Sequence, residues 1–466
     1  MLTYDVRIWS VRSRPSKSSP FQLRWRVGTQ IHYDVFANFA LADGRRSELM
    51  SAVRKGEQFD SESGLPASEL RERKSPSWYE HACAYALMKW PRAAAKHRAG
   101  IAEALTTVTL VLVSSGKAKP DRALLRRTLR TWAFQMERTE GGVVARKDAR
   151  TMSDEESAAL AWVARNSLKM SELGTSERMR AALTALSLKL DGTAAADNTF
   201  RRKRTTFNNA LRYAVERDLL TANPLSRIDW EPPDTDDEVD FRYVPDPGLA
   251  RALIQAVRLQ GVRGEHLEAF FGCIYYAATR PSEAAALGET GCVLPDEEDE
   301  EAWGELILSE SRPEVGSGWT DDGQPFEKRG LKRRARKATR SVPIPPVFVR
   351  MLREHIRTYG TAPDGRLFRA VGGGRVRSTE YTEVWQAARE EVLSAEELKT
   401  PLADVPYCLR QAGISLWIKA GVDPVEAAMR AGHSVAVLFR FYAKILRGVQ
   451  DRANELISQA LADQEG

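Results

Sequence analysis

An acidic, proline-containing stretch interrupts the chain near its middle and limits what the rest can fold into. Between Trp230 and Phe241 the sequence WEPPDTDDEVDF holds two prolines, six acids and little that could be buried. Prolines and like charges favour an extended hinge over a packed element. A chain of 466 residues is also long enough for about three domains. The sequence therefore predicts separate folding units on the two sides of this hinge.

The N-terminal part before the hinge begins with β-type patterns. In FQLRWRV, Leu23, Trp25 and Val27 alternate with polar residues, which is typical of a half-buried strand. Similar runs precede and follow it, and residues 40–59 have helical spacing. We expect a small β-β-β-α module within residues 1–68.

The remaining chain divides into two further expected domains. A polar stretch with Pro76, over residues 69–77, is predicted to be a linker. Residues 76–230 show helical spacing throughout, which predicts a helical domain. Residues 241–466 begin with helices, continue with β-type runs and finish in helices, as an α+β domain would. The predicted fold class is therefore multidomain, mainly α with small β elements.

Positive charge is concentrated in two runs. The net charge is +6, and residues 328–340 (KRGLKRRARKATR) contain eight Lys or Arg and no acid. Residues 201–204 read RRKR. Such runs favour a polyanionic partner. The four cysteines lack metal-ligand spacing, and no apolar run reaches the roughly 18 residues of a membrane span. We therefore expect a cytoplasmic, nucleoid-associated protein without metal, cofactor or membrane contact.

Arginines outside the C-terminal part are candidates for DNA contact. Arg24 and Arg26 alternate with the apolar positions of the expected strand, so they either face water or lie on DNA. Arg201, Arg202 and Arg204 lie near the start of a helix, where cations oppose the macrodipole. This placement favours a ligand-binding role, with a solvated charged face as the alternative.

Two pieces of the C-terminal part have the residue types of a phosphate site. In AATRPSEAAAL, Arg280 lies between two helical runs, with Pro281 at the expected first helical position and Glu283 one turn in. The basic run 328–340 is followed by an alternation through Val342 and Ile344. This predicts a β-hairpin with a positively charged tip that could enter a DNA groove, or alternatively a flexible charged loop.

Two further pieces follow in the last 65 residues. In VPYCLRQAGISLWIKAGVD, Arg410 is early in an expected helix that stops at Gly421. In GHSVAVLFRFYAKIL, Gly432 ends one helix and Tyr442 lies two turns into the next. Tyr442 lies off the apolar stripe of that helix, which is formed by Val437, Phe441 and Ile445. Tyr442 therefore need not be a packing residue.

Taken together, these pieces resemble the catalytic domain of tyrosine recombinases, the phage-integrase family. TRPSEAAAL resembles the family's first arginine motif, with Arg280 and Glu283 at the matching positions. Arg410 matches the second arginine, and the Gly-His pair at His433 matches the third motif. His433 follows Arg410 by 23 residues and precedes Tyr442 by 9 residues, as in the family pattern.

The resemblance extends over most of the chain, with one departure. Residues 76–230 resemble the core-binding domain of these recombinases, and residues 1–68 resemble the arm-type DNA-binding modules of integrases from actinobacterial mobile elements. The departure is Tyr407, which stands where the family usually has a histidine. A phenol can donate a hydrogen bond to a phosphate oxygen but is a poor general base near neutral pH.

The resemblance implies a role for each residue of the constellation. Tyr442 would attack DNA to form a 3′-phosphotyrosine, and Arg280 and Arg410 would hold the phosphate. His433 would donate a hydrogen bond to the phosphate, while Glu283 would orient the arginine. Such chemistry needs neither a metal ion nor ATP, because the covalent bond conserves the energy of the cleaved phosphodiester.

The general acid and the partners are also implied. Lys332 is our candidate for protonating the leaving 5′-oxygen, with Lys337 as its rival, and Arg334 and Lys337 are expected to contact DNA. The implied function is site-specific integration, by a homotetramer on two duplexes with core and arm sites. An excisionase and a host DNA-bending protein are further partners that the family implies. The alternatives are a catalytically impaired DNA-binding regulator and a type IB topoisomerase-like enzyme.

Overall fold

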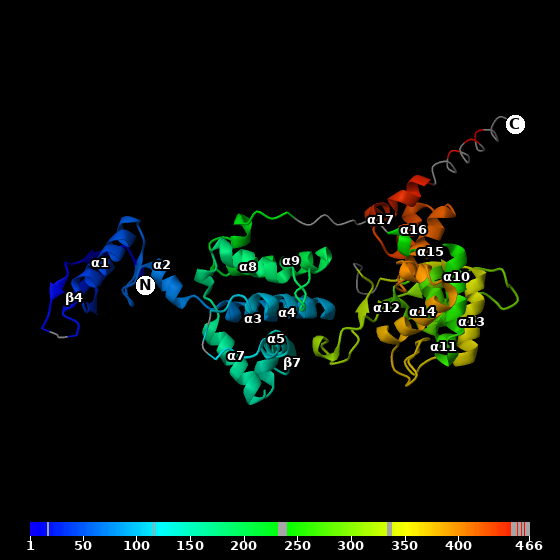
Figure 1. The fold of residues 1–466 in the computed structure, drawn as a ribbon, viewed down its shortest axis with the longest axis horizontal. Helices are drawn as coiled ribbons and strands as arrows, with labels where there is room; N and C mark the ends of the chain where they lie inside the picture. The colour runs from blue at the N-terminus through cyan, green and yellow to red at the C-terminus, as the bar shows by residue number, and fades with distance from the viewer. Residues whose placement is uncertain are drawn as a thin grey trace. The chain divides into compact units, whose positions relative to one another are not determined.

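The computed structural model covers residues 1–466 and assigns most of them to regular elements (Figure 1). It describes the whole chain except residues 16–17, 115, 117, 232–239, 333–337, 449–453, 455–457, 459–460 and 462–466. Most of the acidic hinge and the sequence-predicted DNA contacts Arg334 and Lys337 lie outside the described residues. The described chain is mainly helical with small sheets, so the predicted fold class is confirmed.

The chain forms two compact units, Met1–Pro233 and Asp234–Gly466. The boundary lies in the stretch expected to be a hinge. The N-terminal unit contains both the β-β-β-α module and the helical segment, and their division into separate domains stays a prediction. Among the described residues, no helix combines the length and the apolar character needed to cross a membrane.

A small antiparallel sheet begins the N-terminal unit. Its central strand is β4 (Phe21–Val27), which pairs with β5 on one side and with β2 and β3 on the other. The sheet consists of β2 (Val6–Ile8), β3 (Arg12–Ser13), β4 and β5 (Gln30–Phe36), and α1 (Phe39–Arg54) covers it. A separate two-stranded sheet is formed by β1 (Leu2–Thr3) and β6 (Phe59–Asp60). Leu23, Trp25 and Val27 are buried against α1, which confirms the alternation read from the sequence.

The polar stretch predicted to be a linker is instead helical. Helix α2 covers Ala67–Lys74, none of its residues is buried, and it ends before Pro76. Its charges lie three and four residues apart, as in the ion pair between Arg73 and Glu69. Such pairs support a solvated helix, so polarity alone did not distinguish a helix from a linker here.

Helices dominate the rest of the N-terminal unit (Figure 1). They are α3 (Trp78–Lys89), α4 (Ala95–Thr109), α5 (Arg122–Thr128), α6 (Arg146–Ala149), α7 (Asp154–Asn166), α8 (Ser176–Leu186) and α9 (Asp197–Glu216). Trp78 of α3 packs edge-on against Phe207 of α9, with ring centroids 5.5 Å apart. The expected all-helical pattern is wrong at one place, where β7 (Met136–Thr139) and β8 (Gly142–Ala145) form a hairpin. Gly142, with φ of 122°, allows its turn.

The C-terminal unit combines a helical core with a three-stranded and a two-stranded sheet. Helix α11 is central and packs against α10, α13 and α15 (Figure 1). The helices are α10 (Pro247–Arg258), α11 (Gly261–Tyr276), α12 (Pro281–Ala284), α13 (Pro346–Tyr359), α14 (Ser378–Val392), α15 (Cys408–Lys419), α16 (Pro424–Ala431) and α17 (Val435–Gly448). The strands are β9 (Cys292–Val293), β10 (Gly304–Leu308), β11 (Glu310–Ser311), β12 (Arg329–Gly330) and β13 (Arg340–Ile344).

The described part of the basic run does not form the hairpin that its pattern predicted. Strand β12 lies at the beginning of the run and β13 starts at its last residue, but the two strands do not pair with each other. Strand β12 pairs with β11, whereas β13 pairs with β10, which also pairs with β9. The basic residues therefore connect two different sheets, and the alternation of β13 reflects its burial against β10.

Candidate active site

Arg280 and Glu283 form the first half of the site, at the junction of α11 and α12. Arg280 precedes Pro281, the first residue of α12, as predicted. Its backbone N–H donates to Glu283 Oε2 at 2.9 Å, and its Nη1 donates to Glu283 Oε1 at 2.7 Å. The helix start therefore fixes the guanidinium through a carboxylate one turn away, while 18% of the Arg280 side chain stays exposed.

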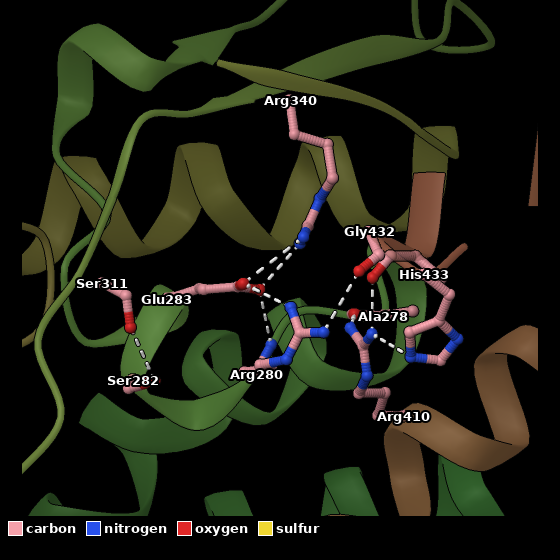
Figure 2. A network of polar contacts seen from close by, with 10 residues as sticks. Ala278, Arg280, Ser282, Glu283, Ser311, Arg340, Arg410, Gly432 and His433 are labelled. Carbon is pink, nitrogen blue, oxygen red and sulfur yellow. Dashed lines mark hydrogen bonds and ion pairs between the residues drawn. The ribbon is translucent and has the colours of Figure 1, made fainter. Parts of the chain in front are cut away.

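A third residue, Arg340, completes this ion-pair network (Figure 2). Arg340 begins β13, is 3% exposed, and donates to both oxygens of Glu283 through Nη2 at 2.7 Å and Nη1 at 3.3 Å. Sequence reasoning treated Arg340 only as part of a charged run. Its position in the strand pattern could have identified it. Arg340 lies two residues before Val342 and four before Ile344, so it is on the same face of the strand as these two buried residues.

Glu283 is a buried carboxylate that stays ionised. Burial alone would raise the pKa of Glu283, but the charges of the surrounding arginines, Arg340 first, lower the pKa to about 2. A carboxylate that is 1% exposed is retained in such a place only when it is paired and hydrogen-bonded. Glu283 is thus the fixed counter-charge of the site.

Arg410 forms the second half of the site, near the start of α15. It is 1% exposed and donates to the carbonyl oxygens of Ala278 and Ala431. Ala278 has φ of 44°, a conformation that costs an alanine about 1–2 kcal/mol. Gly413, one turn after Arg410, lets α15 approach α11 closely, because a Cβ there would lie 2.0 Å from the carbonyl oxygen of Tyr275. Two backbone carbonyl oxygens, one just after α11 and one in α16, therefore hold the guanidinium of Arg410.

His433 lies beside Arg410 and is neutral. Arg410 Nη2 donates to His433 Nε2 at 2.9 Å, so the proton of the neutral ring is on Nδ1. Burial and the charges of the three arginines lower the pKa of His433 to about 3. Among the described residues Nδ1 has no hydrogen-bond partner. His433 can therefore serve as a hydrogen-bond donor through Nδ1 but not as a cation near neutral pH.

Gly432 joins the two halves of the site. It ends α16 in the left-handed region, with φ of 64°, as the sequence predicted. Its carbonyl oxygen accepts from Arg280 Nη2 at 3.2 Å, and His433 follows it (Figure 2). Three arginines, Arg280, Arg340 and Arg410, lower the pKa of the carboxylate of Glu283, so among the described side chains of the site positive charge exceeds negative charge. The site is therefore suited to an anion with several oxygens, such as a phosphodiester.

Tyr442 lies next to this positive site, on α17. It is 2% exposed and packs in an apolar cluster with Leu438, Ile414 and Ala431. The helix departs from helical geometry at Tyr442, where φ is −117° and ψ is 19°. Burial raises the pKa of Tyr442, whereas the charge of Arg410 lowers it. Of the expected stripe, the side chains of Phe441 and Ile445 lie outside the described residues.

The two other predicted residues near the reaction are exposed. Tyr407 directly precedes α15 and is 39% exposed. Tyr407 lies close enough to Arg410 and Tyr442 for a coulombic interaction with both side chains. Lys332 follows β12 by two residues and is exposed. The structure brings together five of the predicted residues, which are Arg280, Glu283, Arg410, His433 and Tyr442. The role of Lys332 as general acid stays a prediction.

The predicted DNA-binding arginines of the N-terminal unit have two kinds of environment. Arg24 and Arg26 lie on the face of β4 opposite the core, with the guanidinium of Arg24 5.4 Å from the ring centroid of Trp9. Arg202 is exposed on α9. Arg204 instead stacks on Trp230, at 3.6 Å from the ring centroid, so packing already explains its position. Arg201, also on α9, is half-buried.

No metal site emerges among the described residues, where no group of three or more His, Cys, Asp or Glu side chains could hold an ion. No protein-family model and no curated protein matches the chain.

The chain is similar to several solved structures. The first is the integrase of the Tn1549 transposon in complex with a circular intermediate DNA, with 16% identity, 66% of this chain and 96% of that chain covered, and a TM-score of 0.46. A lambda integrase tetramer bound to a Holliday junction has 10% identity, coverage of 92% and 94%, and a TM-score of 0.45. XerH recombinase in a post-cleavage complex has 10% identity, coverage of 77% and 95%, and a TM-score of 0.40. At these low identities and TM-scores, function must be inferred from the side chains of the site.

Proposed function

We propose that this chain is a site-specific DNA recombinase of the tyrosine type, an integrase that cleaves and rejoins DNA through a 3′-phosphotyrosine. The observation that carries the proposal is the joining of Arg280, Arg410 and His433 around one buried carboxylate, beside Tyr442. These residue types suit transfer of a phosphodiester to a hydroxyl group without a metal ion.

Each side chain has a defined part in the cleavage step. The Tyr442 oxygen attacks the scissile phosphorus and gives up its proton to water, and the bond from phosphorus to the 5′-oxygen breaks as the new bond forms. Charge then develops on the non-bridging oxygens, where Arg280 and Arg410 offer permanently protonated donors. His433 donates from Nδ1, and Lys332 protonates the leaving 5′-oxygen. Attack by a 5′-hydroxyl from the partner duplex reverses the step and releases the tyrosine.

Tyr407 takes the place of the usual histidine as a neutral donor. Its position before α15, the helix of Arg410, and its closeness to Arg410 and Tyr442 support a place for its hydroxyl near the same phosphate. Donation to a phosphate oxygen stabilises developing charge, whereas proton abstraction from Tyr442 by a phenol would be slow near neutral pH. Tyr407 is thus proposed to bind the phosphate and not to act as the base.

The N-terminal sheet is proposed to bind a second type of DNA site, the arm site. On the outer face of the sheet, Arg26 is directly opposite Arg7, and Arg24 is opposite Tyr33. Cationic and aromatic side chains on one sheet face fit a DNA backbone and groove. The C-terminal unit and α9 would bind the core site. With two DNA-binding regions on one chain, we propose a tetramer that bridges two duplexes.

Recombination between paired sites tests this proposal. DNA that flanks the gene supplies candidate attachment sites, and two plasmids carrying them should give recombinant products only with the full chain and with both sites present. Relaxation of an arbitrary supercoiled plasmid without such products would instead favour a topoisomerase.

A second candidate function is favoured by the burial of Tyr442. A nucleophile that is 2% exposed, with a pKa raised by burial, is what a DNA-binding regulator without cleavage activity would also show. Specific binding to the flanking DNA without any strand cleavage, even on nicked substrates, would support the regulator.

A further inference from the structure

We propose that Arg340 is a positioning residue that keeps Arg280 available for the DNA phosphate. This inference rests on the proposed function. Arg340 has no role in the motif pattern discussed above, and it is not expected to touch DNA itself, because only 3% of the residue is exposed. Its effect would act through Glu283.

The contacts of Glu283 show how the two arginines share it. Arg340 binds the carboxylate in a fork, with Nη1 on Oε1 and Nη2 on Oε2. Arg280 uses only one guanidinium nitrogen, Nη1, and its backbone N–H takes the second oxygen. Each oxygen of Glu283 thus accepts two hydrogen bonds. Arg340 occupies the bidentate geometry that a carboxylate and a guanidinium prefer, so Arg280 is held by one edge only.

Removing Arg340 would change this division. Glu283 would remain buried and ionised with a single strong partner, and the side chain of Arg280 could turn to form the fork itself. The Nη2 of Arg280, which now reaches the carbonyl oxygen of Gly432 at 3.2 Å, would then be drawn away from the site. The phosphate would lose part of one of its two guanidinium partners.

Arg340 also contacts the backbone that carries His433. A Cβ added to Gly432 would lie 2.2 Å from Arg340 Nη1, so the guanidinium fills the space above that glycine. One buried side chain therefore lies against both the carboxylate that holds Arg280 and the peptide that precedes His433 (Figure 2). This placement couples the two halves of the site.

Arg340 is also the last residue of the basic run that contains Lys332. It is the first residue of β13, opposite Leu308 of β10. Its fork to Glu283 holds this end of the run next to Arg280.

The test compares the full-length wild-type chain with Arg340→Gln and Arg340→Lys on a nicked suicide substrate from the flanking DNA. Single-turnover formation of the covalent adduct should fall by about 10²-fold in Arg340→Gln, the loss typical of a weakened oxyanion partner. Binding of the same DNA should change by less than about threefold, since Arg340 makes no DNA contact. Arg340→Lys should form the adduct about tenfold faster than Arg340→Gln, because lysine restores the positive charge but not the bidentate contact with Glu283.

A neutral scissile group separates positioning from a general structural role. On a substrate with a methylphosphonate at the cleavage position, the guanidiniums have less charge to stabilise, so the deficit of Arg340→Gln should shrink to about threefold or less. An equal deficit on both substrates, in a variant that unfolds like the wild type, would overturn the inference. If Arg340→Gln does not fold, the same comparison with Arg340→Lys decides, with a tenfold deficit on phosphate expected to vanish on methylphosphonate.

Arg357→Gln is the matched control, because Arg357 lies on α13 with 76% of its side chain exposed and should match the wild type on both substrates. The outcomes also separate the inference from the function on which it rests. Absence of any adduct with the wild-type chain contradicts the proposed function, whereas a wild-type adduct with an unaffected Arg340→Gln contradicts only the role of Arg340.

Discussion

Replacement of Glu283 by glutamine should destabilise the C-terminal unit strongly, and only above acidic pH. The substitution keeps the shape of the side chain but removes the negative charge between Arg340 and Arg280, whose contacts to it are both 2.7 Å long. The two guanidiniums would then be left next to each other with no counter-charge. Breaking a buried ion pair by removing one partner typically costs about 3–5 kcal/mol.

The pKa of Glu283 gives an independent magnitude. The pKa falls from its ordinary value of 4.5 to about 2 in the folded chain. A difference of about 2.5 in pKa corresponds to about 3 kcal/mol of stability. Because the folded-state pKa is the lower one, this stability is present above pH 4.5 and is lost as the pH falls toward 2. The Glu283→Gln variant has no carboxylate to titrate at this position, so its stability lacks this pH-dependent contribution.

The assay is urea unfolding at pH 7 and at pH 3, with hydrogen exchange of peptides from α11 and α15 to follow the C-terminal unit. We expect Glu283→Gln to unfold with about 3 kcal/mol less free energy than the wild type at pH 7, and with a clearly smaller difference at pH 3. Glu354→Gln is the control, since 48% of that side chain is exposed; it should stay within about 0.5 kcal/mol. Equal stability of Glu283→Gln and the wild type at pH 7 would refute the reasoning.

Three further substitutions test separate parts of the structure. In thermal unfolding, Gly432→Ala should destabilise the protein by about 1 kcal/mol or more beyond the effect of Gly421→Ala. Both positions have positive φ, but only the Cβ added at Gly432 would lie 2.2 Å from a neighbouring atom. Equal destabilisation by the two substitutions would contradict the close approach of Arg340 to Gly432. Arg24→Ala should reduce the slope of log affinity against log salt concentration for arm DNA by about 1. The control Arg54→Ala, at an exposed position, should leave the slope unchanged. The same slope in both variants would show that Arg24 does not contact the DNA. Lys332→Ala should block cleavage of ordinary DNA but cleave DNA with a 5′-thio leaving group, which needs no proton; failure of this rescue would point to another general acid.

The local placement of the candidate site residues could be predicted from the sequence because they lie in short segments. Arg280 and Glu283 are three residues apart at a helix start, and Gly432 directly precedes His433. Proline at the first helical position and glycine at a helix end specify such short segments regardless of the distant chain. The structure places the four residues around one another, as the spacing and the resemblance implied.

The strand pairing and the role of Arg340 could not be read in this way. Arg340 faces the core because β13 pairs with β10, some 30 residues earlier, and not with β12. Register between distant strands depends on packing of both faces, which a single run of basic residues does not reveal. An arginine in a charged run therefore looked solvent-facing although its carboxylate partner is 57 residues away.

Two local patterns were misread for a related reason. Helix α2 is rich in charged residues, which are also typical of linkers. Only the spacing of opposite charges, three and four residues apart, indicates a helix there. Strands β7 and β8 are four residues each, too short to show a period against the surrounding helices.

Identification of the nucleophile tests the central claim most directly. The full-length chain is incubated with a nicked suicide substrate built from the DNA that flanks the gene, and the covalently bound peptide is identified by mass spectrometry. We predict a phosphodiester bond between the DNA 3′-end and Tyr442, and no adduct with Tyr442→Phe. An adduct that persists in Tyr442→Phe, or one that maps to Tyr407, would contradict the account.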